Sequence, residues 1–340
     1  MKKILFICGS LNQTTMLHQI SEHMEGYDKY FSAYYCDGIE RWAARMGLLN
    51  FTVLGNKFRR RTEAYLRAHN LKNDFEGRSH DYDLIVTCSD LMVPKNTVGK
   101  KMVLIQEGMT DPENFAYYLA KNFGLPRYFA STSTTGLSDA YTKFCVASEG
   151  YRDFFEKKGI NKNKLIATGV PNFDNCKEFL NNNFPHNNYV LVCTSDVRET
   201  YKYENRKKFI KKVVEIAKGK QIIFKLHPNE NVPRATREIN KYAPGALVYS
   251  VGNTNHMIAN CDVLVTKFST VVYVGLALGK EVHSAFELEE LKKLTPIQNG
   301  GASAVNIARV CTQVLEYGEV KEKSREEDFV PFNKTYSAAQ

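Results

Sequence analysis

The sequence lacks any long hydrophobic run. No window reaches the roughly 18 to 20 consecutive apolar residues of a membrane-spanning helix. The opening Met-Lys-Lys leads directly into ILFICGS, without the pattern of a signal-peptide cleavage site. Neither GxGxxG nor GxxxxGK followed by Ser or Thr occurs, so neither NAD binding nor P-loop chemistry is supported. We expect a cytoplasmic protein with neither type of nucleotide site.

Paired cysteines and clustered histidines are missing as well. The eight cysteines show no CxxC motif and no paired spacing, and they stand at Cys8, Cys36, Cys88, Cys145, Cys176, Cys193, Cys261 and Cys311. This pattern predicts free thiols in a reducing compartment, with neither a disulfide framework nor a zinc site. The histidines show no HExxH motif or other ligand spacing, and no cluster of paired carboxylates occurs. We therefore expect no bound metal and no cofactor.

The charge balance is basic. The formal net charge of +9 favours an anionic partner, such as a nucleotide, a phosphorylated acceptor or an anionic lipid. The densest basic stretch is NKFRRRTEAYLRAHN, where Arg59, Arg60 and Arg61 could contact the inner face of a membrane. Such stretches are more often solvated helix faces. No nucleic-acid partner is expected, because no stacking-aromatic motif or recognition helix accompanies the charge.

The chain reads as two α/β halves. With 340 residues, 43% of them hydrophobic, two domains are more probable than one. Short apolar segments alternate with helical ones, which predicts parallel sheets covered on both faces. The expected strands are KKILFIC, FTVLG, DLIVTCS, KMVLIQ and KFCVAS, then NYVLVCTS, KQIIFKL, ALVYS, CDVLVT and KEVHSA. We predict domains at 1–172 and 187–325, a linker at 173–186 and a tail at 326–340.

Two polar pairs follow expected strands in the second half. His227-Pro228 ends the strand KQIIFKL, and Ser269-Thr270 follows CDVLVT. An imidazole N–H, two hydroxyls and the amides of a helix starting near Thr270 would suit a phosphate group. The alternative is that both pairs only cap a strand end and a helix. The loop after NYVLVC adds the further phosphate candidates Thr194, Ser195 and Arg198, the last of which could equally be a solvated surface residue.

An acid follows a strand in the first half. Glu107 comes directly after KMVLIQ and before a glycine that allows a tight turn. A carboxylate at a strand end is a reasonable general base for an alcohol, although most glutamates in turns are merely solvated. Gln106 and the loop STSTTG could shape an acceptor pocket beside it. The loop after the first strand adds Gly9, Ser10 and Gln13 to the acceptor-side candidates.

These motifs resemble the GT-B glycosyltransferase-like superfamily. The resemblance rests on TGVPNFD at the crossover, KLHPNE, and CDVLVTKFSTVVYVGLALGKEV. It is closest to bacterial transferases with an HP motif and a later Ser-Ser or Ser-Thr motif, the CDP-glycerol glycerophosphotransferases and the sialyl- and Kdo-transferases of capsule and lipopolysaccharide assembly. The implied fold is two Rossmann-like domains with parallel sheets facing a central cleft.

The resemblance also implies residue roles. His227, Ser269 and Thr270 would bind the donor phosphate, Pro228 would set the geometry of His227, and Glu107 would be the base. The sequence departs from the pattern at QEG, where the sialyltransferases have two acids before the glycine, and at Lys267, where glycerophosphotransferases usually have aspartate. A lysine at that position would add positive charge beside the phosphate.

The resemblance predicts an inverting, metal-independent transferase. It would move a sugar or polyol phosphate from a CMP- or CDP-linked donor, less favourably a UDP-linked one, to a hydroxyl of a glycan or lipid-linked glycan. A second reading is a UDP-N-acetylglucosamine 2-epimerase-like enzyme, which HPNENVPR also suggests; FSTVVYVG lacks the glycine pair and glutamates of that family. A third is a non-catalytic protein that binds a nucleotide-sugar or glycan.

Overall fold

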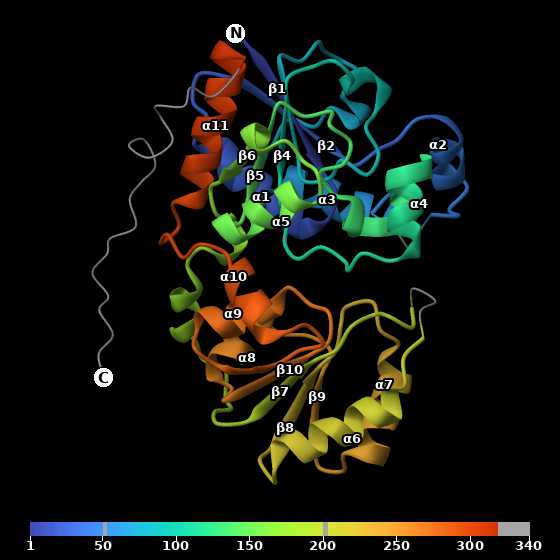
Figure 1. Cartoon of the computed structure of the whole chain (residues 1–340), viewed down its shortest axis with the longest axis vertical. Coiled ribbons are helices and arrows are strands. Elements are labelled where there is room, and N and C mark those ends of the chain that lie inside the picture. Colours follow the sequence, from blue (N-terminus) through green and yellow to red (C-terminus); the bar gives the residue numbers. More distant parts are fainter. Residues whose placement is uncertain (50–52, 200–202, 319–340) are drawn as a thin grey trace. The chain divides into compact units, whose positions relative to one another are not determined.

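The computed structural model describes residues 1–49, 53–199 and 203–318. Contacts divide the chain into two compact units, unit 1 with residues 1–174 and the segment from 296 onward, and unit 2 with residues 175–295. Each unit is an α/β structure around one parallel sheet (Figure 1). The predicted tail at 326–340 lies outside the described residues.

Unit 1 contains a six-stranded sheet in the order β2-β1-β3-β4-β5-β6. Every neighbouring pair is parallel. The chain therefore places β2 on one side of β1 and all later strands on the other. The strands are β1 (Lys3–Cys8), β2 (Asp28–Ala33), β3 (Leu84–Thr87), β4 (Met102–Ile105), β5 (Lys143–Val146) and β6 (Leu165–Ala167).

Helices cover this sheet, and α1 begins where β1 ends. The hydroxyl of Ser10 accepts from the amide of Gln13 and so caps α1, which packs between α3 and the distant α11. The helices of unit 1 are α1 (Leu11–Glu22), α2 (Gly38–Arg45), α3 (Asn56–Ala68), α4 (Phe115–Phe123), α5 (Glu149–Lys157) and α11 (Ser303–Tyr317). The 3-10 segments used below are η1 (Phe75–Gly77) and η3 (Arg127–Thr134).

Unit 2 contains a five-stranded parallel sheet in the order β11-β10-β7-β8-β9. The strands are β7 (Val190–Cys193), β8 (Ile222–Lys225), β9 (Leu247–Tyr249), β10 (Val263–Thr266) and β11 (Glu281–His283). The helices are α6 (Arg206–Ala217), α7 (Val232–Tyr242), α8 (Thr254–Asn260), α9 (Val271–Ala277) and α10 (Leu288–Leu294). Helices α6 and α7 pack against each other, as do α8 and α9 (Figure 1).

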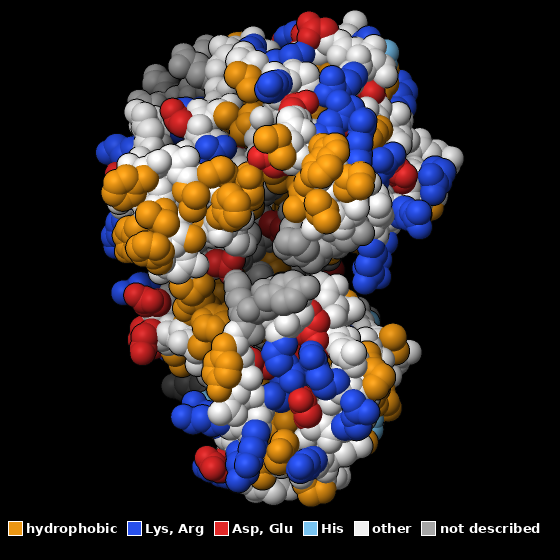
Figure 2. Space-filling view, turned by 90° about the vertical axis from the view of Figure 1, so that its right-hand side faces the viewer, with side chains coloured by type: hydrophobic (Ala, Val, Ile, Leu, Met, Phe, Trp, Pro, Cys, Tyr) orange, Lys and Arg blue, Asp and Glu red, His pale blue; other side chains and the backbone are white. Residues whose placement is uncertain are grey.

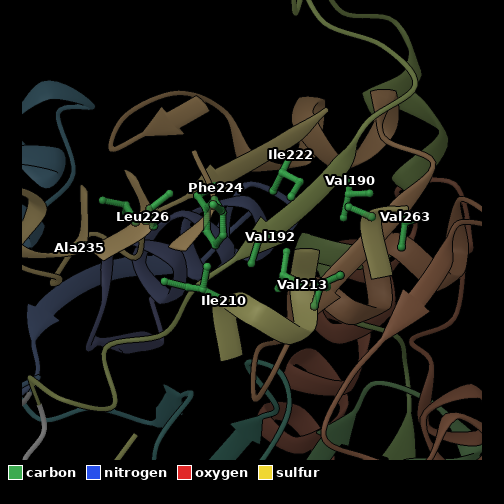
Figure 3. Packing of buried hydrophobic residues seen from close by; sticks show 13 residues of the cluster. Val190, Val192, Ile210, Val213, Ile222, Phe224, Leu226, Ala235 and Val263 are labelled. Carbon is green, nitrogen blue, oxygen red and sulfur yellow. The ribbon is translucent and has the colours of Figure 1, made fainter. Parts of the chain in front are cut away.

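The core of unit 2 lies between its sheet and the pair α6 and α7. Phe224 of β8 and Val192 of β7 meet Ile210 and Val213 of α6 there (Figure 3). These side chains are fully buried. The apolar positions of α6 recur at helical spacing and those of the strands are buried on both faces, as expected for a covered parallel sheet.

The structure differs from the sequence prediction at three strands. Val53, Leu54 and Gly55 of the expected strand FTVLG form a turn before α3, and the first two residues of that segment lie outside the described residues. Strand β2 was not expected, because its sequence DKYFSA mixes polar and apolar residues, as suits the edge strand that it is. The three-residue β6 was too short to give a pattern.

The domain prediction differs at the C-terminal side. Residues 296–318 were assigned to the second domain, yet α11 contacts α1 and strands β3, β4 and β5 of unit 1. Its buried side chains include Ile307, Val310, Cys311 and Val314, which complete the unit 1 core. The division after residue 174 falls within the expected boundary region, and the segment expected as a linker packs on α8 and α9 through η6 (Cys176–Leu180).

Candidate functional site

The strand order of unit 1 reverses between β1 and β3. Ligands of open parallel sheets bind outside the carboxyl ends of strands at such a reversal. Glu107, which follows β4, extends across to the loop after β1: the hydroxyl of Ser10 donates to Glu107 Oε1 at 2.9 Å, and Gln13 Nε2 donates to Oε2 at 2.6 Å. The carboxylate is half-buried. Three sequence-predicted residues thus meet at this edge.

Gln13 holds this arrangement by using both ends of its amide. Its Oε1 accepts from the backbone N–H of Gly9 at 2.9 Å, while its Nε2 donates to Glu107. A side chain at position 9 would collide with the Gln13 amide, because a Cβ there would lie 2.3 Å from Oε1. Glycine is therefore required for the contact, and the backbone amide of Gly9, an acceptor-side candidate, is occupied by Gln13.

Gln106 does not belong to this site. Its side chain is buried, with Oε1 accepting from the amide of Ala147 and Nε2 donating to the carbonyl of Gly108. These bonds tie the end of β4 to the end of β5. Gln106 therefore has a structural role in the turn that presents Glu107.

The loop STSTTG is mainly packed inside unit 1. Ser133 and Thr134 are fully buried, and the carboxylate of Asp90 accepts from the amides of Gly136 and Ser138. The buried ammonium of Lys158 donates to the carbonyl of Ser133. Burial lowers the pKa of Lys158 to about 8, since it disfavours the charged form.

One contact connects this loop to the segment that follows Glu107. Thr132 Oγ1 accepts from the amide of Asp111 at 2.9 Å. The loop thus supports that segment, and its buried hydroxyls do not form the acceptor pocket proposed from sequence.

In unit 2 the strand order reverses between β7 and β10. Thr266 of β10, Cys193 of β7 and Lys225 of β8 stand side by side in register across the sheet. The residues that follow them therefore emerge at one edge: Lys267, Ser269 and Thr270 after β10, Thr194 and Ser195 after β7, and His227 after β8. The parallel sheet brings together the phosphate-site candidates of unit 2.

The HPNE segment (227–230) is a tight turn whose first and last residues are joined by two hydrogen bonds. The amide of Glu230 donates to the carbonyl of His227 at 3.0 Å, and Pro228 supplies the fixed φ favoured at the second position of such a turn. In return, the Glu230 carboxylate accepts from the amide of His227 at 3.0 Å. The hydroxyl of Thr194 accepts from that same amide at 3.1 Å. The polar residues after the apolar strand β8 therefore form a turn that is held by hydrogen bonds.

Glu230 is the centre of a buried ionic chain. Its side chain is fully buried and accepts from Thr194 Oγ1 and from the Arg206 guanidinium. Arg206, at the start of α6, lies 2.8 Å from the buried carboxylate of Glu204, which also accepts from Lys267 Nζ at 2.9 Å. The chain connects the loops after β7, β8 and β10. Sequence reasoning missed Glu230, Glu204 and Arg206.

Two predicted cations are already paired. Lys267 donates to Glu204 and lies over the ring of Phe209, so its charge is largely balanced by that carboxylate. Arg198 is neither solvated nor free, because its Nη1 donates to Glu238 Oε1 at 2.9 Å. Both side chains that were predicted as cations of a phosphate site are therefore balanced by glutamates.

His227 keeps one ring nitrogen available. The amide of Asn229 donates to Nδ1 at 3.3 Å, which requires a lone pair there and places the proton of the neutral ring on Nε2. Asp196 lies 3.5 Å from Nδ1 and accepts from the Asn229 side chain at 2.9 Å, so it also fixes this loop. The side chain is 37% exposed, and its Nε2–H can donate to a ligand oxygen.

Hydroxyls complete this edge. Ser195, Ser269 and Thr270 are half-buried, and Thr270 precedes α9 without a side-chain capping bond. Because α9 has seven residues, little helix dipole acts there. Thr266, which sequence reasoning missed, is 3% exposed and its hydroxyl has no hydrogen-bond partner within the described ranges. A buried hydroxyl without a partner is rare and here lies at the strand reversal.

Neither a metal cluster nor a reactive thiol occurs in the described part of the chain. No group of three or more His, Cys, Asp and Glu residues there could hold a metal ion. All eight cysteines are buried, and none is in a disulfide. Burial raises the pKa of Cys193 to about 12, and the Cys88 pKa is raised by burial and then by the Glu107 charge. These thiols are therefore inert at neutral pH.

The structure is similar to several solved structures. A Listeria monocytogenes protein provisionally named a UDP-N-acetylglucosamine 2-epimerase matches with a TM-score of 0.61 at 12% identity over 97% of this chain and 99% of that one. The Neisseria meningitidis UDP-GlcNAc 2-epimerase bound to UDP-GlcNAc gives 0.54 at 14% identity over 93% and 92%. The wall teichoic acid polymerase TagF, as a variant with CDP-glycerol, gives 0.51 at 10% identity over 92% and 89%.

These similarities confirm the predicted GT-B fold class, with a parallel sheet in each of two α/β units. No family model and no curated protein matches the sequence. At such low identity the similarity establishes the fold alone. Function must therefore be argued from the site residues.

The ionic chain predicts that Glu230→Gln strongly lowers the stability of unit 2. The change leaves the buried Arg206 guanidinium without one of its two carboxylates, so the free energy of unfolding of unit 2 should fall by about 3 to 5 kcal/mol. Hydrogen exchange of the β7 and β8 amides measures it. The control is Glu289→Gln, an exposed carboxylate paired with Lys292, for which the change should stay below about 1 kcal/mol. A loss as small for Glu230→Gln would contradict the assigned role.

The lowered pKa of Lys158 predicts that the free energy of unfolding rises with pH. Its pKa is about 8 when folded, compared with 10.5 for an unperturbed lysine. Between these values the unfolded chain binds more protons, so unfolding becomes less favourable as pH rises. From pH 8 to 10, Lys158 should add about 2 to 3 kcal/mol to the free energy of unfolding.

Lys158→Met should remove that increment, as seen in urea titrations of parent and variant at both pH values. The adjacent and exposed Lys157 provides the control, because Lys157→Met should leave the pH dependence unchanged. Equal pH dependence in the parent and in Lys158→Met would show that Lys158 is not buried as an ammonium.

Proposed function

We propose that the protein is an inverting transferase that uses a nucleotide-activated donor. The transferred group is a sugar or a polyol phosphate, the donor is CMP- or CDP-linked in preference to UDP-linked, and the acceptor is a hydroxyl of a cell-surface glycan precursor. The observation that carries the proposal is the edge of the unit 2 sheet, where His227 and four hydroxyls gather at the strand reversal. Two of the similar structures hold UDP-GlcNAc or CDP-glycerol.

The unit 2 edge supports phosphate binding through neutral donors. His227 Nε2–H and the hydroxyls of Ser195, Ser269, Thr270 and Thr266 are suitable donors to phosphate oxygens. Lys267 and Arg198 are balanced by glutamates and contribute little free charge. Pro228 and Thr194 contribute by holding the turn that positions His227. Pro228 shapes this turn, and the hydroxyl of Thr194 accepts from the His227 amide. The proposed anion site would therefore bind phosphate through neutral hydrogen-bond donors, with little contribution from positive charge.

Glu107 is the proposed general base. Ser10 and Gln13 orient its carboxylate, and a half-buried acid at a strand reversal suits proton removal from an alcohol. In sugar transfer, the acceptor oxygen attacks the anomeric carbon as its proton passes to Glu107. The bond from that carbon to the donor phosphate breaks, and the nucleotide leaves with the electron pair. Hydrogen bonds from the unit 2 edge stabilise the charge on the departing phosphate.

A UDP-N-acetylglucosamine 2-epimerase-like activity is the second candidate. The epimerase structures give the higher TM-scores and cover nearly all of both chains. The segment FSTVVYVG, which lacks the glycine pair and the glutamates of that family, favours the transferase. A binding protein without turnover is the third candidate, and loss of the base distinguishes it, since binding does not need Glu107.

His227→Ala should weaken nucleotide binding about tenfold or more, because one hydrogen bond to a charged phosphate is lost. Calorimetric titration with CMP, CDP, UDP and GDP measures this. His283→Ala, at the partly exposed end of β11, is the control and should bind as the parent does. Binding of CMP or CDP supports the proposed donor, and binding of UDP alone favours the epimerase. Absence of binding, or parental affinity in His227→Ala, would refute the anion site.

Glu107→Gln should keep nucleotide affinity and lose about two to four orders of magnitude in turnover. Turnover is followed as nucleotide release from a panel of CMP-, CDP- and UDP-linked donors with glycan acceptors. Glu113→Gln is the control and should retain activity, because this partly exposed carboxylate of the same loop faces Lys158, with Glu113 Oε1 3.9 Å from Lys158 Nζ. Normal turnover in Glu107→Gln excludes it as the base, and a parent that binds but never turns over identifies a binding protein.

A further inference from the structure

We propose that α2, α4 and η3 of unit 1 form a docking surface for an anionic lipid bilayer. The six exposed side chains of this docking surface are Ile39, Trp42, Met46, Phe115, Phe123 and Phe129. This inference is independent of the reaction proposed above. No helix in the described ranges is long and apolar enough to cross a membrane, so the contact would be with the bilayer surface.

Helix α2 turns its apolar stripe outward. Ile39, Trp42 and Met46 are spaced as i, i+3 and i+7, which places them on one helical face. That face normally packs on a core, but here the three side chains are 80%, 58% and 63% exposed. None of the residues within α2 is buried. Helix α2 therefore has an apolar face without a partner in the described structure.

Helix α4 and η3 extend the same apolar surface. Phe115 and Phe123 of α4 are 78% and 79% exposed, and Phe129 of η3 is exposed as well. Helix α4 packs on η3, and the Tyr128 hydroxyl of η3 donates to Glu40 of α2 at 3.0 Å. Figure 2 shows hydrophobic side chains gathered in groups on the side of unit 1 that carries these elements. Single exposed apolar residues are ordinary, but such a gathering marks an interaction surface.

The charges beside this surface favour an anionic bilayer. Arg45 on α2 and Arg60 and Arg61 on α3 are exposed, without an acidic partner among the described residues. Helices α2 and α3 are neighbours, because both contact η1: Arg41 pairs with Glu76, and Arg59 stacks on Phe75.

The acids of α2 and η1, and Asp37 just before α2, are already engaged. Glu76 is held by Arg41 and Arg78, Asp37 by Arg78, and Glu40 by Tyr128. Of the three arginines named in the sequence prediction, Arg59 is paired with Glu63, so Arg60 and Arg61 remain.

The side chains suit a bilayer interface better than a protein groove. The six side chains protrude with exposures between 58% and 80%, so they can insert between lipid headgroups, and tryptophan is enriched at that depth. Arginine near an anionic leaflet adds attraction that weakens with salt. Apolar insertion combined with a basic flank is the pattern of proteins that lie on membranes.

Trp42 provides the probe, because it is the only tryptophan in the chain. The full-length protein is titrated with phosphatidylcholine vesicles, with and without phosphatidylglycerol. With phosphatidylglycerol, the Trp42 emission should shift to shorter wavelength, brominated lipid should quench it, and the protein should sediment with the vesicles. Phosphatidylcholine alone should bind about tenfold or more weakly.

Two variants test the surface while retaining Trp42. Phe115→Ser with Phe123→Ser should weaken vesicle binding about tenfold or more, whereas Tyr203→Ser with Val251→Ser, equally exposed in unit 2, should not. Arg60→Glu with Arg61→Glu should weaken it similarly at low salt, whereas the same charge change at Lys211 and Lys212 of α6 should have a much smaller effect.

Three results would overturn the proposal. The first is a Trp42 emission that does not respond to anionic vesicles. The second is an equal effect of test and control variants. The third is an emission shift that follows protein concentration without lipid, together with a dimer that Phe115→Ser with Phe123→Ser disrupts, since the surface would then join two copies of the chain.

Discussion

Parallel strand pairing is the constraint on which the rest of this structure depends. All strands in each sheet run in one direction, so all of them deliver their following residues to a single edge. The strand order reverses once in each sheet, between β1 and β3 and between β7 and β10. Residues distant in sequence, such as Ser10 and Glu107, therefore meet at the edge where open parallel sheets bind their ligands.

The two edges use polar residues differently. In unit 1, neutral donors hold a single carboxylate that stays partly accessible. In unit 2, glutamates balance the cations inside the protein, and the ionic chain through Glu230 and Arg206 holds three loops together. Charges used in this way stabilise the geometry of the loops and attract a phosphate little. Affinity for an anion must then come from oriented donors such as His227 Nε2–H, whose direction is set by the turn around Pro228.

Most strands could be predicted because a strand buried on both faces is a short apolar run, as in LIVT and VLVT. The edge strand β2 was not predicted because its sequence is partly polar. Helix α11 was assigned to the wrong unit because amphipathic periodicity does not show which sheet a helix covers. Candidate residues that directly follow strands, such as His227 and Glu107, could be selected by their position in the sequence. Glu230 and the pairing of Lys267 could not, because a single sequence does not reveal which acid meets which base inside the fold.

The central claim is that the carboxyl edge of the unit 2 sheet binds the phosphates of a nucleotide. Hydrogen exchange of the full-length protein with saturating CDP and with UDP tests it most directly. The account predicts slower exchange in residues 194–199, 226–231 and 266–271 with at least one of them, because the three loops would be fixed by one ligand. Unchanged exchange in all three loops with both nucleotides, or protection confined to unit 1, would contradict it.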